Sequence, residues 1–298
     1  MDIVVISGFL GAGKTTFITE LVRHAKGTVA VFENELGDVG VDKARMEEDM
    51  TMQEKPNIWE LTEGCICCSL KGDFRQSVLT IANAVDPALL IIEPTGVGLL
   101  SSIMDNLSTL AYERIRLLAP VTIVDALNFT TACNEYGAIA EDQIHHAGHL
   151  VISKTAGHEQ TTAEVKAALA QRGLQEKLLP DAYTLWTEDI WQSILTTPYT
   201  ADGSVAEVET PVLETMAVPF ASFGDIAAFY SAMRALTEGR FGDVYRVKGT
   251  AGIGSIWGRF DIVGTTCDLT AVETKADEKA VIIGRQLDKD AIALLFRQ

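Results

Sequence analysis

A glycine-rich segment near the start of the chain has the residue types and spacing of a phosphate-binding loop. Residues 8–15 read G-F-L-G-A-G-K-T and fit the pattern G-x-x-x-x-G-K-[ST]. Glycines allow backbone N–H groups to close around a phosphate, and the helix N-terminus expected after them adds a positive dipole end. In such a loop the lysine reaches the β- and γ-phosphates, and the hydroxyl of Thr15 ligates Mg²⁺. The residues expected to contact the nucleotide here are Gly8, Gly11, Ala12, Gly13, Lys14, Thr15 and Thr16.

A second segment, E-P-T-G at residues 93–96, follows an apolar run and could face the same phosphates. Glu93 could hold Mg²⁺ through water or polarise the attacking water, and Gly96 could offer its N–H to the γ-phosphate. Lys14, Glu93 and Gly96 are therefore the candidate catalytic residues. Asp125 ends the next apolar run, where it either joins this site or caps the following segment.

Three cysteines crowd together at Cys65, Cys67 and Cys68. Thiolates this close suit a turn that wraps a soft metal such as Zn²⁺, at roughly 2.3 Å from each sulfur. The outer pair also fits the redox spacing C-x-x-C, and inert packing is a third reading, but the middle cysteine favours metal binding. Cys133 and Cys267 are isolated, and we expect them to be ordinary buried residues.

The region around this cluster is acidic. Residues 33–63 contain ten acidic and three basic side chains, a net charge of −7 over 31 positions. This is either a solvated loop or a local field that attracts a cation.

Buried strands and helices are needed to hold these segments. Short runs that are apolar throughout predict parallel strands covered by helices on both faces, and helical patterns between them support this. We therefore expect an α/β fold, a P-loop NTPase domain over residues 1–205 with a mostly parallel sheet. The expected strands are Ile3–Ser7, Thr28–Phe32, Ala88–Ile92, Val121–Val124, Leu150–Ile152 and Ala182–Trp186, and the expected helices include Thr15–Lys26 and Gly72–Val85.

The composition changes after about residue 201, where A-D-G-S resembles a linker. Residues 206–298 are expected to form a small C-terminal α+β domain. Its predicted elements are a helix within Phe220–Glu238, strands at Val244–Lys248, Ser255–Ile262 and Lys279–Ile283, and a closing helix at Asp288–Phe296.

The overall composition narrows the function classes. The chain has 298 residues, 47% of them hydrophobic, and a formal net charge of −17. This apolar content is that of a folded protein, and the negative charge argues against binding nucleic acid or an anionic membrane surface. The first residues lack the basic region of a signal peptide and no apolar run could span a bilayer, so we expect a cytoplasmic protein.

Four segments together make the sequence similar to a known family. They read G-F-L-G-A-G-K-T-T at 8–16, E-N-E-L-G-D-V-G-V-D at 33–42, E-G-C-I-C-C-S-L at 63–70 and E-P-T-G at 93–96. In this combination the chain resembles the CobW family of P-loop GTPases, metal-linked proteins of the SIMIBI class related to the nickel-insertion GTPases of urease and hydrogenase. Residues 242–249, G-D-V-Y-R-V-K-G, resemble the small C-terminal domain of that family.

The resemblance implies roles for particular residues. Residues 33–42 would be the switch segment, and the three clustered cysteines would bind Zn²⁺ or a similar transition metal, with Glu33 and Asp38 as further ligands by matching position. The guanine-reading N-K-x-D of the family falls here on Ser153, Lys154, Thr155 and Ala156. Lys154 could still cover the base, but Ala156 cannot accept hydrogen bonds from guanine N1 and N2. The cofactors would be GTP or ATP, Mg²⁺ and Zn²⁺.

The favoured function is a metal chaperone or metal-insertion NTPase in which nucleotide state and metal affinity are coupled. Its partner would be a client metalloprotein or a corrinoid protein, and a homodimer is left open. The alternative is a binding or regulatory module whose nucleotide specificity has decayed. A small-molecule kinase is a third class, which would leave the cysteines unexplained. His145 and His149 have i,i+4 spacing on an expected helix, where exposed or capping roles are favoured over metal binding.

Overall fold

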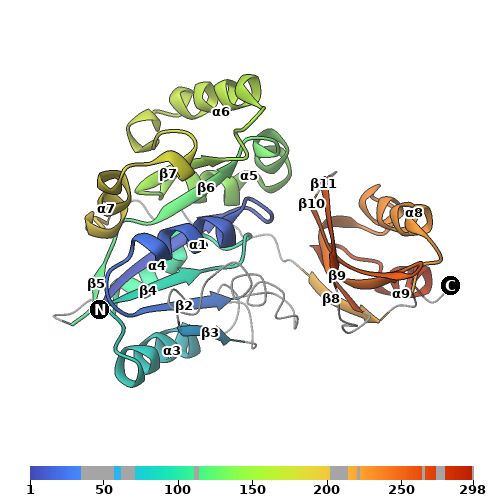
Figure 1. The fold of residues 1–298 in the computed structure, drawn as a ribbon, viewed down its shortest axis with the longest axis horizontal. Helices are drawn as coiled ribbons and strands as arrows, with labels where there is room; N and C mark the ends of the chain where they lie inside the picture. The colour runs from blue at the N-terminus through green and yellow to red at the C-terminus, as the bar shows by residue number, and fades with distance from the viewer. Residues whose placement is uncertain are drawn as a thin grey trace. The chain divides into compact units, whose positions relative to one another are not determined.

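The computed structural model describes residues 1–34, 57–61, 71–110, 114–201, 214–219, 222–263, 266–272 and 279–296. The chain divides into two compact units. The described residues up to 201 belong to the N-terminal unit, and those from 214 onward belong to the C-terminal unit (Figure 1). Among the helices of these ranges, none is long and apolar enough to cross a membrane.

The N-terminal unit is built on a parallel sheet with the strand order β3-β2-β4-β1-β6-β7, and β5 pairs with β1. Its strands are β1 (Asp2–Gly8), β2 (Val29–Asn34), β3 (Asn57–Leu61), β4 (Leu89–Glu93), β5 (Arg116–Leu117), β6 (Val121–Asp125) and β7 (His149–Ser153). Its helices are α1 (Lys14–His24), α3 (Lys71–Ala84), α4 (Leu100–Ser108), α5 (Phe129–His145), α6 (Glu159–Gln171) and α7 (Glu188–Thr196). The predicted α/β fold with a mostly parallel sheet is confirmed.

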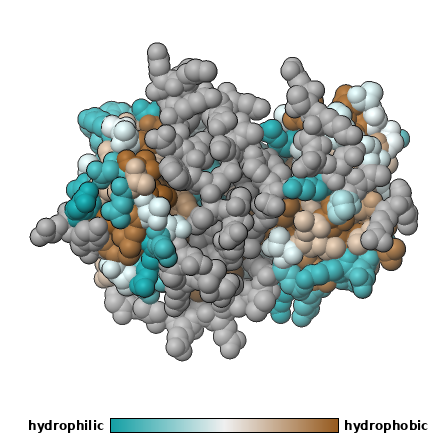
Figure 2. Space-filling view, turned by 90° about the horizontal axis from the view of Figure 1, so that it is seen from below, coloured by the Kyte–Doolittle hydropathy of each residue, from teal (hydrophilic) through white to brown (hydrophobic). Residues whose placement is uncertain are grey.

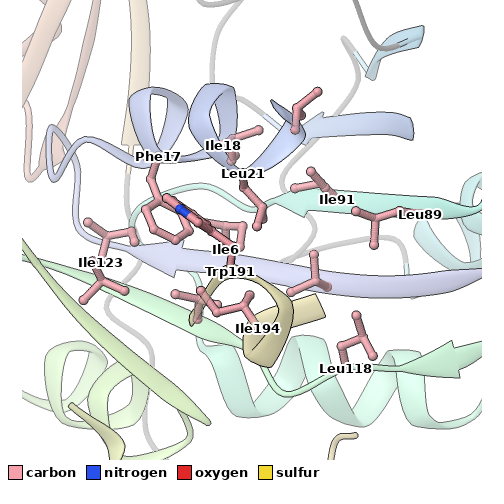
Figure 3. Packing of buried hydrophobic residues seen from close by; sticks show 14 of the residues in the cluster. Ile6, Phe17, Ile18, Leu21, Leu89, Ile91, Leu118, Ile123, Trp191 and Ile194 are labelled. Atoms are coloured by element: carbon pink, nitrogen blue, oxygen red, sulfur yellow. The ribbon is translucent and has the colours of Figure 1, made fainter. Parts of the chain in front are cut away.

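Both faces of this sheet are apolar because helices cover both (Figure 1). On β1, Ile6 packs on the face that α1 and α7 cover, while Val5 packs on the face of α3 and α4. Figure 3 shows Phe17 of α1 and Trp191 of α7 meeting over the strands, with ring centroids 5.5 Å apart. This packing fixes α1, and with it the loop that joins β1 to α1.

The predicted strand Ala182–Trp186 is wrong. The segment contains a 3₁₀ helix, Tyr183–Leu185, which begins after Ala182 in a left-handed conformation with φ 54°. Trp186 follows it and is buried in the core against Trp191, with its indole N–H donating to the carbonyl of Pro180 at 2.9 Å. The segment therefore joins the core through the Trp186 side chain and not as a strand of the sheet.

The expected helical spacing of two histidines is also wrong. His145 ends α5 and His149 begins β7, so the two side chains do not share a helix face. The backbone N–H groups of Gly148 and His149 both donate to the carbonyl of Pro120, which draws the chain into the sheet directly after the helix.

The C-terminal unit is an antiparallel sheet with the order β11-β10-β9-β12-β8 and helices packed on one face. Its elements are β8 (Glu214–Pro219), α8 (Ile226–Thr237), β9 (Asp243–Ile253), β10 (Ile256–Val263), β11 (Thr266–Val272), β12 (Lys279–Arg285) and α9 (Lys289–Leu295). Phe229 of α8 and Phe260 of β10 meet in its core, with ring centroids 5.2 Å apart. At the right of Figure 2, this unit shows apolar side chains on its surface with polar side chains beside them. The predicted small α+β domain is confirmed as a separate antiparallel unit.

Candidate functional site

The N-terminus of α1 is built to face an anion. β1 ends at Gly8 and α1 begins at Lys14, and the cap residue Gly13 is left-handed with φ 92°. No side chain caps this helix end, and its first turn contains no acidic residue. The first N–H groups of a helix have no partner within the helix, and the helix dipole adds partial positive charge. This end of α1 is therefore suited to bind phosphate.

Lys14 is held inside the loop. Its side chain is only 7% exposed, and Nζ donates to the carbonyls of Gly8 and Phe9, at 3.1 Å in each case. Nζ also lies 3.9 Å from Oε1 of Glu93. A buried ammonium group at the mouth of a phosphate loop is poised to contact an anion without a large rearrangement.

Thr15 and Glu93 meet in the same place. The Thr15 hydroxyl lies 3.4 Å and 3.3 Å from the two carboxylate oxygens of Glu93. A hydroxyl beside a carboxylate at the end of a strand is a typical set of oxygen ligands for Mg²⁺, which takes few protein ligands and keeps several waters. The structure thus brings together Lys14, Thr15 and Glu93, which the sequence predicted from two distant motifs.

Two glycines are required by close backbone packing. A Cβ on Gly96 would lie 2.5 Å from the backbone nitrogen of Leu10, so this residue packs directly on the phosphate loop. A Cβ on Gly8 would lie 2.4 Å from the carbonyl oxygen of Ile123 on β6. Contacts under about 3 Å are not tolerated by a real side chain, so both positions need glycine.

Glu33 lies on the strand beside Glu93. The parallel pairing of β2 and β4 places these two residues in register, and Glu60 of β3 occupies the matching position on the other side of β2. The Glu33 side chain is 4% exposed. Glutamates of adjacent strands therefore line up at the carboxyl edge of the sheet, where parallel folds place their ligands.

The segment at the end of β7, Ser153 and Lys154, packs against the phosphate loop. The Ser153 hydroxyl donates to the carbonyl of Ala12 at 2.7 Å, which joins the end of β7 to the loop. Lys154 adopts φ 56°, and its Nζ lies 3.0 Å from Oδ2 of Asp125. Asp125 also accepts from the backbone N–H of Leu127 at 2.8 Å. Asp125 therefore caps the turn after β6 and orients Lys154 as well.

No role was predicted for α5, yet this helix holds the segment after Glu93. Gln143 is fully buried, and its amide donates to the carbonyls of Gly96 at 3.2 Å and Gly98 at 2.9 Å. Asp142 accepts from the backbone N–H of Ser101 at 3.2 Å. One signal was available: Gln143 falls in an apolar helical stripe with Ile139, Ala140 and Ile144.

Four of the five predicted zinc ligands, Cys65, Cys67, Cys68 and Asp38, lie outside the described residues, and the fifth, Glu33, lies on β2. Within the described ranges, no group of three or more His, Cys, Asp or Glu side chains is arranged to hold a metal ion. The other two cysteines, Cys133 and Cys267, are half-buried rather than buried, and burial raises the pKa of both thiols.

Both parts of the sequence match domain families of known proteins. Residues 2–178 match the CobW/HypB/UreG nucleotide-binding domain, and residues 213–298 match the cobalamin synthesis protein cobW C-terminal domain. The zinc chaperone YeiR of Escherichia coli (strain K12) is 35% identical over 177 residues, which are 57% of this chain and 50% of YeiR. The zinc chaperone YjiA of the same strain is 30% identical over 161 residues, 51% of this chain and 49% of YjiA.

The chain thus spans about half the length of the curated relatives it matches. Among solved structures, the crystal structure of Zn(II)-bound YjiA GTPase from E. coli aligns over 100% of this chain and 99% of that one, with 20% identity and a TM-score of 0.46.

Proposed function

The chain belongs to the CobW/HypB/UreG family, and from this premise we propose that it is a nucleoside-triphosphate hydrolase that acts as a metal chaperone. Its cargo would be Zn²⁺ or a similar transition metal, and its partner a client metalloprotein or corrinoid protein. The printed names of its relatives, zinc chaperones and a zinc-regulated GTPase metalloprotein activator, support this reading.

One structural observation carries the nucleotide half of the proposal. The uncapped N-terminus of α1, the buried Lys14 and the Thr15–Glu93 contact converge on one point at the carboxyl edge of the sheet. Helix dipole, lysine and a Mg²⁺-binding hydroxyl are the groups that stabilise a transferring γ-phosphate. We assign phosphate binding to Gly8, Gly11, Ala12, Gly13, Lys14, Thr15 and Thr16.

The remaining phosphate-side roles follow from position. Glu93 would hold Mg²⁺ through water or polarise the attacking water, since it already contacts Thr15. The N–H of Gly96 would meet the γ-phosphate, since this residue packs on the loop backbone at Leu10. On the base side, Ser153 and the stem of Lys154 would cover the nucleobase.

The metal half of the proposal rests on the family and on residue type. Cys65, Cys67 and Cys68 are suited to Zn²⁺, with Glu33 and Asp38 as further ligands. The cysteines lie in sequence between residues 33–42 and residues 93–96, the two segments expected to sense the γ-phosphate. Metal affinity and nucleotide state would then be linked, and the linkage must act in both directions.

A competitive zinc titration tests this coupling. The protein is titrated with a non-hydrolysable triphosphate and Mg²⁺, and again with diphosphate. We expect tighter zinc binding with the triphosphate, by about 1–3 kcal/mol as is typical of communicating sites. Equal affinities would refute the chaperone mechanism, and unaltered zinc affinity in Cys67→Ala would remove this cysteine from the site.

A second candidate is favoured by a specific residue. Ala156 stands where a guanine-reading aspartate is expected, which suits a binding or regulatory module with altered nucleotide specificity. Steady-state hydrolysis of GTP and ATP by the purified protein separates the two. Turnover of either nucleotide above that of a Lys14→Ala control supports the enzyme, and its absence with retained binding supports the module.

A further inference from the structure

The geometry points to Gln143 as a positioning residue that holds Gly96 against the phosphate loop and thereby makes the site distinguish triphosphate from diphosphate. This inference deepens the proposed function and rests on it. Gln143 lies on α5, outside the phosphate loop and outside the segment that carries Glu93.

Gly96 packs closely on the phosphate loop, since a Cβ there would meet the backbone of Leu10. Its carbonyl accepts from the amide of Gln143, which also donates to the carbonyl of Gly98. A shift of Gly96 relative to α5 would therefore break a hydrogen bond to Gln143.

Gln143 is itself enclosed in the core. Its side chain is fully buried, and its backbone carbonyl separately accepts from the hydroxyl of Thr122 on β6 at 2.7 Å. Its neighbour Asp142 accepts from the N–H of Ser101 in the first turn of α4, where a carboxylate satisfies a helix N–H and favours the dipole. The segment from Gly96 to Ser101 is thus anchored to α5 along its length.

The same helix also contacts the phosphate loop. The ring of Tyr136 packs on Phe9 with centroids 4.9 Å apart. Between Tyr136 and Gln143 the helix is broken at Gly137, whose φ of 32° and ψ of −95° are not helical. The part of α5 before this break therefore touches the loop, and the part after it holds Gly96.

The hydrogen bonds of Gln143 should therefore affect the contact with the γ-phosphate and not the contacts with the α- and β-phosphates. The α- and β-phosphates are held by the loop and Lys14, whereas only a triphosphate extends to the N–H of Gly96. Loss of the Gln143 hydrogen bonds should leave diphosphate binding intact and weaken the response to triphosphate. A purely structural role would affect both nucleotides alike.

The test compares Gln143→Met with Thr122→Val. Methionine keeps the length and apolar stem of glutamine but donates no hydrogen bond, while Thr122→Val removes the bond to the backbone carbonyl of Gln143 and leaves the side-chain amide in place. We expect Gln143→Met to bind diphosphate as the wild type does, to bind a non-hydrolysable triphosphate about tenfold more weakly, and to lower kcat more than it changes KM. Thr122→Val should lower the melting temperature while leaving the triphosphate-to-diphosphate affinity ratio unchanged.

A second measurement needs no nucleotide. Amide hydrogen exchange of residues 96–101 in the nucleotide-free protein should be faster in Gln143→Met and unchanged in Thr122→Val. Unchanged exchange in Gln143→Met, or equal losses of diphosphate and triphosphate affinity, would overturn the inference. Failure of the wild type to bind triphosphate would instead refute the proposed function, and the exchange result would still decide whether Gln143 holds this segment.

Discussion

Glu33 and Glu93 stand opposite each other on neighbouring parallel strands, in the register that also pairs Val31 with Ile91. Val31 and Ile91 pack under α1, so the two carboxylates extend the same face of the sheet to its carboxyl edge. Glu93 accepts from the hydroxyl of Thr15. The pair therefore provides two neighbouring carboxylates whose functions can be separated by matched substitutions.

Glu93→Gln should reduce the rate of hydrolysis by about 100-fold. This is the lower end of the range of rate losses expected when a group that accepts a proton or orients a metal-bound water is removed. Nucleotide binding should persist, because Lys14 and the α1 N-terminus remain. Glu33→Gln is the matched control and should keep the hydrolysis rate while weakening zinc binding. Single-turnover hydrolysis and zinc titration of both variants check this. Equal losses of hydrolysis in the two would contradict the separation of roles.

Lys14→Ala should raise the Kd for triphosphate at least tenfold, since removing a charge-assisted contact is worth more than about 1.4 kcal/mol. The affected atom is Nζ, which lies at the loop carbonyls of Gly8 and Phe9. Calorimetric titration measures the change. Lys154→Ala serves as a control on the base side, where the loss should be smaller. Unchanged affinity in Lys14→Ala would exclude this loop as the phosphate site.

Ala156→Asp should sharpen the preference for GTP over ATP. An aspartate there could accept hydrogen bonds from guanine N1 and N2, which are worth about 1.5–3 kcal/mol when charge-assisted. That corresponds to at least about tenfold in the affinity ratio. Competition between the two nucleotides reports it, with Ala156→Asn as the uncharged control. A wild type that already prefers GTP by about a hundredfold would mean that another residue reads the base.

His149 should make the protein less stable in mild acid. Burial lowers the pKa of this histidine below its ordinary value of about 6.5, and its Nε2 is buried with no hydrogen-bond partner among the described residues. Below about pH 6.5 the unfolded chain takes up a proton that the folded state resists, so stability falls as the pH drops toward the lowered folded pKa. Stability conferred by the neutral ring is fully present above about pH 6.5.

His149→Gln removes this titration. Urea unfolding at pH 7.5 and pH 5.5 should therefore show a larger stability loss in the wild type than in the variant. His158→Gln is the matched control, because His158 is exposed. Parallel losses in all three proteins would assign the acid sensitivity to other groups.

The phosphate-side residues could be predicted from sequence because local motifs define them. Residues 8–15 and 93–96 carry their own turn glycines and strand ends, and parallel strands must meet at one edge.

Contacts between segments that are far apart in the sequence could not be predicted, because no local sequence pattern identifies both partners. Gln143 reaches Gly96 across 47 positions of sequence, and a buried glutamine in a helical stripe does not reveal its partner. Strands β3, β8 and β11 were missed for a different reason. Among the described strands, they are the edge strands of their sheets and each pairs with one neighbouring strand. An edge strand is less enclosed than a central one, so its sequence need not be apolar throughout.

In a related protein, the presence of the glycines Gly8 and Gly96 carries different information from the presence of the lysine Lys14. Gly8 is required by the carbonyl of Ile123 and Gly96 by the backbone of Leu10, so backbone packing alone would preserve both in a descendant that no longer bound nucleotide. The side chains of Lys14 and Thr15 instead contact polar groups of the site, the carbonyls of Gly8 and Phe9 and the carboxylate of Glu93. In a survey of related genomes, loss of Lys14 with retention of Gly8 would therefore identify lineages that kept the fold and abandoned the nucleotide.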